Sequence, residues 1–203
     1  MVSSFELNDK LKEAKTLKKV PISSRELSDL LMLGMGAYTP LKGFMNYDDW
    51  KGCCLDMHTS EGIFWPIPIT LSIEDNIAGS LNIGEKISLT SNDLIFATMK
   101  ITEKYSIDKN LECLNIFRTI DDNHPGVNKV MSQGSVNLSG EVKVLNEDHY
   151  PNTYKGLYFK PNETRALFNK MGWEKVAAFQ TRNPMHRSHE YLTKIALEIC
   201  DGV

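Results

Sequence analysis

Apolar residues near the start of the chain recur at helical spacing. Ser23 and Glu26 have the spacing of a capping box, and the leucines that follow them fall on one face of a helix. Gly34 is the expected end of this helix, because glycine readily adopts the backbone conformation that terminates helices. Asn46 is a suitable N-cap for a second helix, which we expect to run to Met57.

In the middle of the chain, the spacing of apolar residues changes from helical to alternating. Alternating apolar residues predict short strands within three segments, Ile67–Ile73, Ile87–Leu89 and Ile95–Ile101. Turn-forming residues at 91–93 separate the last two. Irregular loops are expected in the remainder, since three glycines interrupt it: Gly126, Gly134 and Gly140. Short strands at close spacing indicate a small antiparallel sheet or barrel.

The C-terminal part has the order helix, strand, loop, helix. Pro161 suits the first turn of a helix that we expect to end at Gly172. The apolar run Val176–Phe179 is typical of a buried parallel strand. Asn183 and Pro184 then predict the N-cap and first position of another helix. The stripe that this helix is expected to bury comprises Leu192, Ile195, Ala196 and Ile199. An α/β domain therefore begins near residue 160.

Composition favours an ordinary globular protein. Hydrophobic residues make up 41% of the 203 residues and charged residues 24%, which allows one or two domains with a buried core. No apolar run approaches the roughly 20 residues that span a bilayer, and no secretory signal is visible at the N-terminus. Four cysteines without a C-x-x-C pair indicate reduced, mostly buried thiols. We therefore expect a cytoplasmic protein with no membrane partner.

Charge is unevenly distributed along the chain. The formal net charge is −3, but residues 1–159 hold 16 basic and 21 acidic residues, whereas residues 160–203 hold 7 basic and 5 acidic ones. The acidic balance of the first part argues against a nucleic-acid partner, because phosphate contacts need a basic face. The slight basic excess of the second part coincides with the segment that carries candidate chemistry.

That segment follows the predicted parallel strand. Ligands of open α/β sheets bind beyond the carboxyl ends of strands, and a helix N-terminus there attracts anions. The sequence places hydrogen-bond donors at this point, namely Gln180, Thr181, Arg182 and Asn183. His186 and His189 follow, three residues apart, which places both on one helical face. An arginine fork suits a tetrahedral oxyanion, and two imidazoles suit charge on phosphate oxygens, so the pattern indicates phosphoryl or nucleotidyl transfer.

Simpler interpretations of these residues exist. Asn183 is expected to cap the helix whatever else it does, and Arg182 alone could be a structural ion-pair partner. The two histidines could bind a metal ion, but no third ligand is visible nearby, so we expect no protein-bound metal. Six compatible residues within ten positions favour the chemical interpretation.

The same segment resembles a known family. Residues 179–190, Phe-Gln-Thr-Arg-Asn-Pro-Met-His-Arg-Ser-His-Glu, resemble the signature of the ATP sulfurylases, or sulfate adenylyltransferases. Weaker resemblances lie at four further places, which are residues 38–46, 124–127, 161–165 and 172–173. Matches to the family therefore span most of the chain.

The resemblance implies a mixed α+β fold, with a PUA-like β-barrel domain at residues 1–159 and the start of a Rossmann-like nucleotidyltransferase domain at 160–203. It implies the reaction of ATP with sulfate to adenosine 5′-phosphosulfate and pyrophosphate, or its reverse, with Mg²⁺ and in a homo-oligomer. Gln180 and Arg182 would hold sulfate. The implied catalytic positions are Thr181, Arg182, Asn183, His186 and His189, and these five with Gln180 would contact ATP.

One family feature is missing from the sequence. The second nucleotide-binding motif of the family, Gly-Arg-Asp-His, does not occur in these 203 residues. We therefore expect an incomplete catalytic domain and little activity from this piece alone. Two alternatives remain, a different His-x-x-His nucleotidyltransferase and an RNA-binding PUA-like module, and the acidic balance of residues 1–159 argues against the second.

Overall fold

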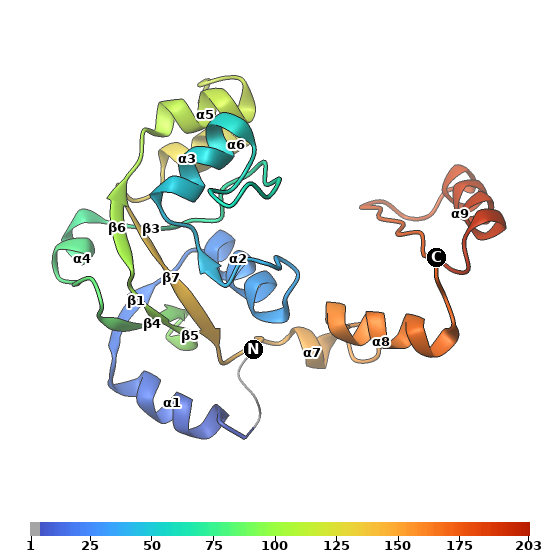
Figure 1. Ribbon diagram of the computed structural model, residues 1–203, viewed down its shortest axis with the longest axis horizontal. Helices are drawn as coiled ribbons and strands as arrows, with labels where there is room; N and C mark the ends of the chain where they lie inside the picture. Colours follow the sequence, from blue (N-terminus) through green and yellow to red (C-terminus); the bar gives the residue numbers. More distant parts are fainter. Residues whose placement is uncertain (1–4) are drawn as a thin grey trace. The chain divides into compact units, whose positions relative to one another are not determined.

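Seven strands form one mixed sheet among residues 5–203, the part of the chain that the computed structural model describes (Figure 1). Their bounds are β1 Lys18–Pro21, β2 Gly43–Phe44, β3 Leu71–Ile73, β4 Lys86–Ser91, β5 Leu94–Lys100, β6 Glu103–Ser106 and β7 Val136–Val144. The helices are α1 Leu7–Thr16, α2 Ser24–Met35, α3 Tyr47–Asp56, α4 Asp75–Gly79, α5 Lys109–Phe117, α6 Pro125–Met131, α7 Tyr150–Thr153, α8 Pro161–Met171 and α9 Arg187–Ile199. The chain divides into two units, residues 1–155 and 156–203.

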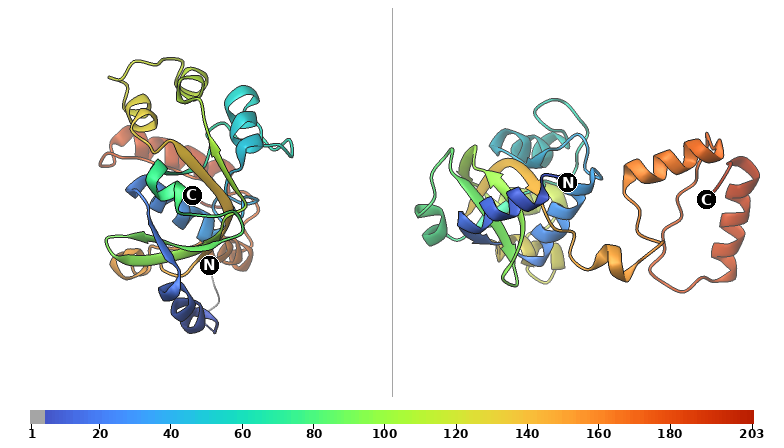
Figure 2. Two further views of the ribbon diagram at one scale, coloured as in Figure 1. Left: turned by 90° about the vertical axis from the view of Figure 1, so that its left-hand side faces the viewer. Right: turned by 90° about the horizontal axis from the view of Figure 1, so that it is seen from below.

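Strand β7 organises the first unit. The sheet order is β1-β4-β5-β7-β2, while β3 and β6 pair with the other part of β7. Among the strand pairs of this sheet within residues 5–155, only that of β1 with β4 is parallel. Because the nine-residue strand β7 pairs with four neighbours, the sheet is bent around it, and Figure 2 shows this curvature from two further sides. The result is a mostly antiparallel, barrel-like sheet, as the alternation predicts.

One face of this sheet forms the core. Ile87, Leu89 and Met99 project from neighbouring strands and are almost completely buried. They pack in one cluster with Leu30 of α2 and Val144 of β7. Burying a side chain of this size contributes about 1.5–3 kcal/mol each. This apolar face holds α2 against β7.

Two buried carboxylates connect helices to their surroundings. The Glu26 carboxylate completes the predicted capping box by accepting from the Ser23 N–H at 2.8 Å, and its other oxygen accepts from the Ser72 N–H of β3 at 2.8 Å. In α5, Glu112 accepts from the indole N–H of Trp50 at 2.6 Å. Burial raises the pKa of Glu112. Helix α3, which carries Trp50, begins at the predicted N-cap Asn46.

Three expectations about glycines are wrong. Helix α2 passes Gly34 and ends at Gly36, which has a φ of +83°. A Cβ on Gly34 would lie 2.7 Å from the Val144 side chain, so this glycine serves helix–sheet packing. Gly140 lies inside β7 rather than in a loop, and a Cβ there would meet the Lys100 carbonyl oxygen of β5. Gly126 lies within α6.

Strand lengths also differ from the expectation. Ile67 is 57% exposed, and β3 begins only at Leu71, since only residues 71–73 pair with β7, opposite its residues 136–138. Asn92 and Asp93 have positive φ values of 48° and 62°, which is the geometry of a tight hairpin turn between β4 and β5. The turn predicted at 91–93 is therefore confirmed.

The second unit contains two helices and one parallel bridge. Helix α8 begins at Pro161 and ends at Gly172, as predicted. We expected a strand over Val176–Phe179. It is reduced to a single parallel bridge between Val176 and Gly202, because the second unit, residues 156–203, has no strand with which more of its residues could pair. The Asp201 carboxylate accepts from the Glu174 and Lys175 N–H groups, both at 2.8 Å, and fixes this bridge.

Two further properties concern the thiols and the membrane. Cys53, Cys54 and Cys113 are buried free thiols, which confirms the expectation from the sequence, and Cys200 is half-buried. Burial raises the pKa of Cys53 to about 12.

Between residues 5 and 203, every helix is too short or too polar to span a membrane.

Candidate active site

The segment 180–186 forms the loop between the Val176 bridge and α9. Thr181 and Asn183 close a tight turn in it: the Thr181 hydroxyl donates to the Asn183 carbonyl at 3.0 Å and accepts from the Asn183 N–H at 3.1 Å. The side chains of Gln180 and Arg182 are exposed and have no hydrogen-bond or ion-pair partner among residues 5–203. The loop thus leaves an amide and a guanidinium free to bind an anion.

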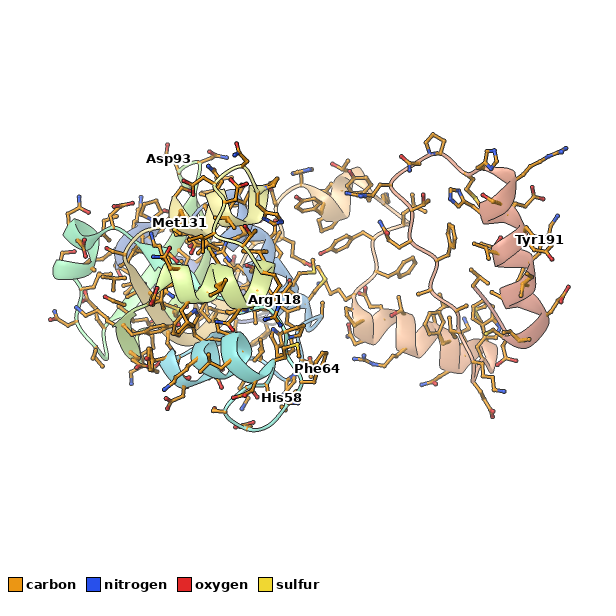
Figure 3. All side chains as sticks on the ribbon, turned by 90° about the horizontal axis from the view of Figure 1, so that it is seen from above. His58, Phe64, Asp93, Arg118, Met131 and Tyr191 are labelled. Atoms are coloured by element: carbon orange, nitrogen blue, oxygen red, sulfur yellow. The ribbon has the colours of Figure 1, made fainter. Side chains whose placement is uncertain are left out.

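Helix α9 begins later than predicted. Its N-cap is His186, so the expectation that Asn183 caps the helix and Pro184 occupies its first position is wrong. The N–H of Asn183 is engaged by Thr181, and Asn183 belongs to the preceding turn. In Figure 3, Tyr191 marks the first part of this helix.

The two histidines form a capping box at this helix start. The His189 Nδ1 accepts from the His186 N–H at 3.1 Å, and the His186 Nδ1 accepts from the Ser188 N–H at 3.4 Å. Their ring centroids are 6.5 Å apart, with the ring planes nearly perpendicular. A neutral imidazole that accepts at Nδ1 carries its hydrogen at Nε2. Both rings therefore present an Nε2–H donor.

Electrostatics at this helix start favour an anion. The N-terminus of a helix carries a partial positive charge from the aligned peptide dipoles, and the exposed Arg182 adds a full one. The nearest acidic residue on α9, Glu190, is paired with Lys194 at 2.6 Å. The segment supplies guanidinium, amide and imidazole donors, which are groups that bind phosphate or sulfate.

A metal ion does not fit the donors of this segment. In the described part of the chain, no group of three histidine, cysteine or acidic side chains could hold one. Magnesium prefers carboxylate and phosphate oxygens, whereas the loop offers N–H donors.

Ser188 was missed by the sequence reasoning. Its hydroxyl lies 3.2 Å from the His186 Nδ1, and its N–H donates to the same atom. Ser188 thereby fixes the orientation of the His186 ring. The available signal was its place two residues after a histidine at a helix start, where a free N–H needs an acceptor.

The predicted apolar stripe of α9 is exposed rather than buried. Leu192 is 55% exposed, Ile195 37% and Ile199 69%. The helix itself and its apolar periodicity are as predicted. Its apolar face is uncovered because the second unit contains no sheet against which the helix could pack.

Comparisons with known proteins agree with these features. A family model described as PUA-like domain matches residues 1–147, and one described as ATP-sulfurylase matches residues 155–203. A sulfate adenylyltransferase of Chlorobium chlorochromatii is 52% identical over 205 residues, covering 100% of this chain and 51% of the relative. That of Syntrophobacter fumaroxidans is 56% identical over 194 residues, covering 94% and 47%. The chain thus spans about half the length of the curated relatives it matches.

A solved structure is also similar. The structure titled "Hexameric APS kinase from Thiobacillus denitrificans" superposes with a TM-score of 0.70 and 26% sequence identity, covering 97% of this chain and 35% of that one. These matches confirm the resemblance that residues 179–190 indicate, and the mixed α+β fold with a PUA-like N-terminal part.

Proposed function

The chain belongs to the PUA-like domain family and is homologous to sulfate adenylyltransferases, and on this premise we propose that residues 180–189 begin an adenylyltransferase site. The proposed reaction joins ATP and sulfate to adenosine 5′-phosphosulfate and releases pyrophosphate, or runs in reverse. We place the catalytic domain from residue 160 onward. One observation carries the proposal: within ten residues the chain places the unpartnered side chains of Gln180 and Arg182 and two imidazoles that present Nε2–H donors at a helix N-terminus.

We assign each side chain the role that the family resemblance implies and that its donors can perform. Gln180 and Arg182 would hold sulfate, because an amide and a guanidinium fork together can donate to several of its oxygens. Thr181 and Asn183 form the turn that presents these two side chains and lie within the proposed ATP site. The Nε2–H groups of His186 and His189 would donate to the phosphate oxygens of ATP.

Catalysis would rest on positioning and on charge. Sulfate is already an anion, so its oxygen needs no base before it attacks the α-phosphorus while pyrophosphate leaves on the opposite side. Holding the two anions in line supplies the main advantage, and the donors around them offset their mutual repulsion and the charge of the leaving group. Magnesium would enter with the phosphates of ATP, since the donors of this loop do not suit it, and we assign no step to it.

Two alternatives differ in what they require. Another nucleotidyltransferase of the His-x-x-His type would not need the Gln180 and Arg182 pair, so turnover with sulfate rather than with an organic phosphate distinguishes it. An RNA-binding role of the PUA-like part would need a basic face, and residues 1–159 are acidic overall. A homo-oligomer is part of our proposal, supported by the hexameric protein to which the chain is structurally similar.

The test is pyrophosphate release from ATP and sulfate. It is measured on the 203-residue chain and on a chimera that adds the half of the Chlorobium chlorochromatii relative that this chain does not cover. We expect turnover from the chimera and little from the chain alone. Arg182→Ala in the chimera should abolish turnover, whereas the control Lys170→Ala, which removes an exposed cation of α8 outside the site, should keep it. A folded Arg182→Ala chimera with normal turnover would contradict the assigned role.

A further inference from the structure

Three lysines gather on the outer face of the sheet in the first unit. Strand register places Lys86 of β4 directly opposite Lys100 of β5, and Thr98 of β5 opposite Lys143 of β7. This is the face opposite to the apolar core, because side chains alternate along a strand. Like charges directly opposite each other destabilise a sheet. The register therefore concentrates positive charge at a cost to the fold.

Most of this charge is left uncompensated. Lys86 is paired with Glu13 of α1, and Glu13 also pairs with Lys10. Lys100 and Lys143 form no ion pair within residues 5–203. Glu141 lies on the same face, but no lysine nitrogen comes within salt-bridge distance of it in the described chain. A unit that is acidic overall thus carries a local surplus of positive charge.

The lysines line a cavity whose wall includes Thr98, a buried residue with an unsatisfied hydroxyl. The cavity has a volume of about 300 Å³ and is lined by Lys86, Thr98, Lys100, Glu141 and Lys143. Thr98 is 1% exposed, and its hydroxyl has no hydrogen-bond partner in the described structure. An unsatisfied buried hydroxyl is unfavourable, and each such group in a native protein calls for an explanation.

We propose that this cavity binds a small tetrahedral oxyanion, sulfate or phosphate. Such an anion accepts a hydrogen bond from the Thr98 hydroxyl and balances the charges of Lys100 and Lys143. It also relieves the repulsion between Lys100 and Lys86. A nucleic-acid strand fits less well, because it needs an extended basic face, whereas here Glu141 borders a single cavity. The site belongs to the PUA-like part and does not depend on the proposed catalytic role of residues 180–189.

The test is a titration of the isotopically labelled 203-residue chain, followed by NMR of backbone amides at constant ionic strength. Sodium sulfate and sodium phosphate are separate arms, sodium chloride is the blank, and a single-stranded RNA is the fourth arm. We expect saturable shifts at residues 86, 98, 100 and 143 with sulfate or phosphate, and the arm that saturates at lower concentration identifies the preferred anion. Shifts equal to those in chloride, or shifts with RNA alone, would overturn the proposal.

Variants separate this site from other anion sites. Lys143→Met should weaken binding about tenfold, the effect of losing one charge-assisted contact. Lys51→Met removes the same charge from an exposed position of α3 and should change nothing at these residues. Arg182→Ala should also leave the shifts at residues 86–143 intact, so failure of the catalytic proposal and failure of this one are distinguishable. Equal weakening by Lys143→Met and Lys51→Met would reduce the effect to net charge and refute the site.

Thr98→Val provides a second readout. Valine keeps the shape and strand preference of threonine but lacks the hydroxyl. In anion-free buffer the variant should melt at the same temperature as the parent or higher, because an unsatisfied donor is gone. In saturating sulfate or phosphate it should gain less thermal stability than the parent does. An equal anion-induced gain in both proteins would show that the hydroxyl does not contact the anion.

Discussion

Substituting His189 by glutamine separates its structural role from its proposed chemical one. In the structure, His189 is the third residue of α9, and its Nδ1 accepts from the His186 N–H at 3.1 Å. Glutamine is a natural partner at this position of a capping box, since its side-chain oxygen can accept from the same N–H. When the glutamine side-chain oxygen accepts this bond, its amide nitrogen does not lie where the imidazole Nε2–H of His189 lies. His189→Gln should therefore preserve the helix start and impair the reaction, whereas His189→Ala loses both functions.

The magnitudes follow from the exposure of the site. The hydrogen bond to the His186 N–H is solvent-exposed, so its loss in His189→Ala should cost about 0.5–2 kcal/mol of local stability, typical of a lost cap. The 13-residue helix is of marginal length for independent stability, so its first turn should open measurably more often. Removing one preorganised donor to a developing charge should lower kcat about 100-fold or more.

Two measurements test this separation. Amide hydrogen exchange by NMR at residues 186–190 reports the helix start, and pyrophosphate release by the chimera reports the chemistry. His149→Gln, which removes an exposed imidazole from the first unit, is the matched control and should alter neither. Normal turnover by His189→Gln would refute the chemical role and leave His189 a capping residue alone. Loss of protection in His189→Gln equal to that in His189→Ala would refute the capping argument.

Three further predictions concern the first unit and are read by urea denaturation. Glu26→Ala removes a buried carboxylate that joins α2 to β3, and should cost about 3–5 kcal/mol of unfolding free energy, whereas the exposed Glu61→Ala should change it little. Glu112→Gln keeps an acceptor for the Trp50 indole N–H. Because burial raises the pKa of Glu112, the unfolding free energy of the parent should fall relative to that of the variant as the pH rises above about 4.3. Parallel pH profiles of the two proteins would contradict this. Gly43→Ala should destabilise strongly, since its Cβ would overlap a backbone carbonyl oxygen of β7, and an unchanged midpoint would contradict that geometry.

Local signals predicted the first unit where the physical cause is itself local. The Ser23 capping box, the Asn46 cap and the tight turn after Ser91 each involve residues within a few positions of one another. Their outcome depends little on the rest of the fold, so spacing alone identifies them.

The sequence interpretation of Gly34 and Gly140 was wrong because the contacts that require glycine at these positions are not local. A glycine that marks a turn and a glycine that admits a neighbouring strand are the same letter in the sequence. Position 140 of β7 requires glycine because a Cβ there would overlap the Lys100 carbonyl oxygen. Position 34 of α2 requires glycine because a Cβ there would overlap the Val144 side chain. In each case the contacted residue is far away in the sequence, so only the fold reveals which use applies.

The start of α9 shows that general N-cap preferences can point to the wrong residue in a candidate functional loop. Asparagine is a better N-cap than histidine by general preference, so the sequence favours Asn183. The Thr181 hydroxyl engages both the N–H and the carbonyl of Asn183, which commits this residue to a turn and moves the helix start to His186. The later start places both imidazoles in the first turn, with Nδ1 occupied by backbone N–H groups and Nε2–H free. The departure from propensity is thus the feature that gives the candidate site its donors, as expected where local preference yields to function.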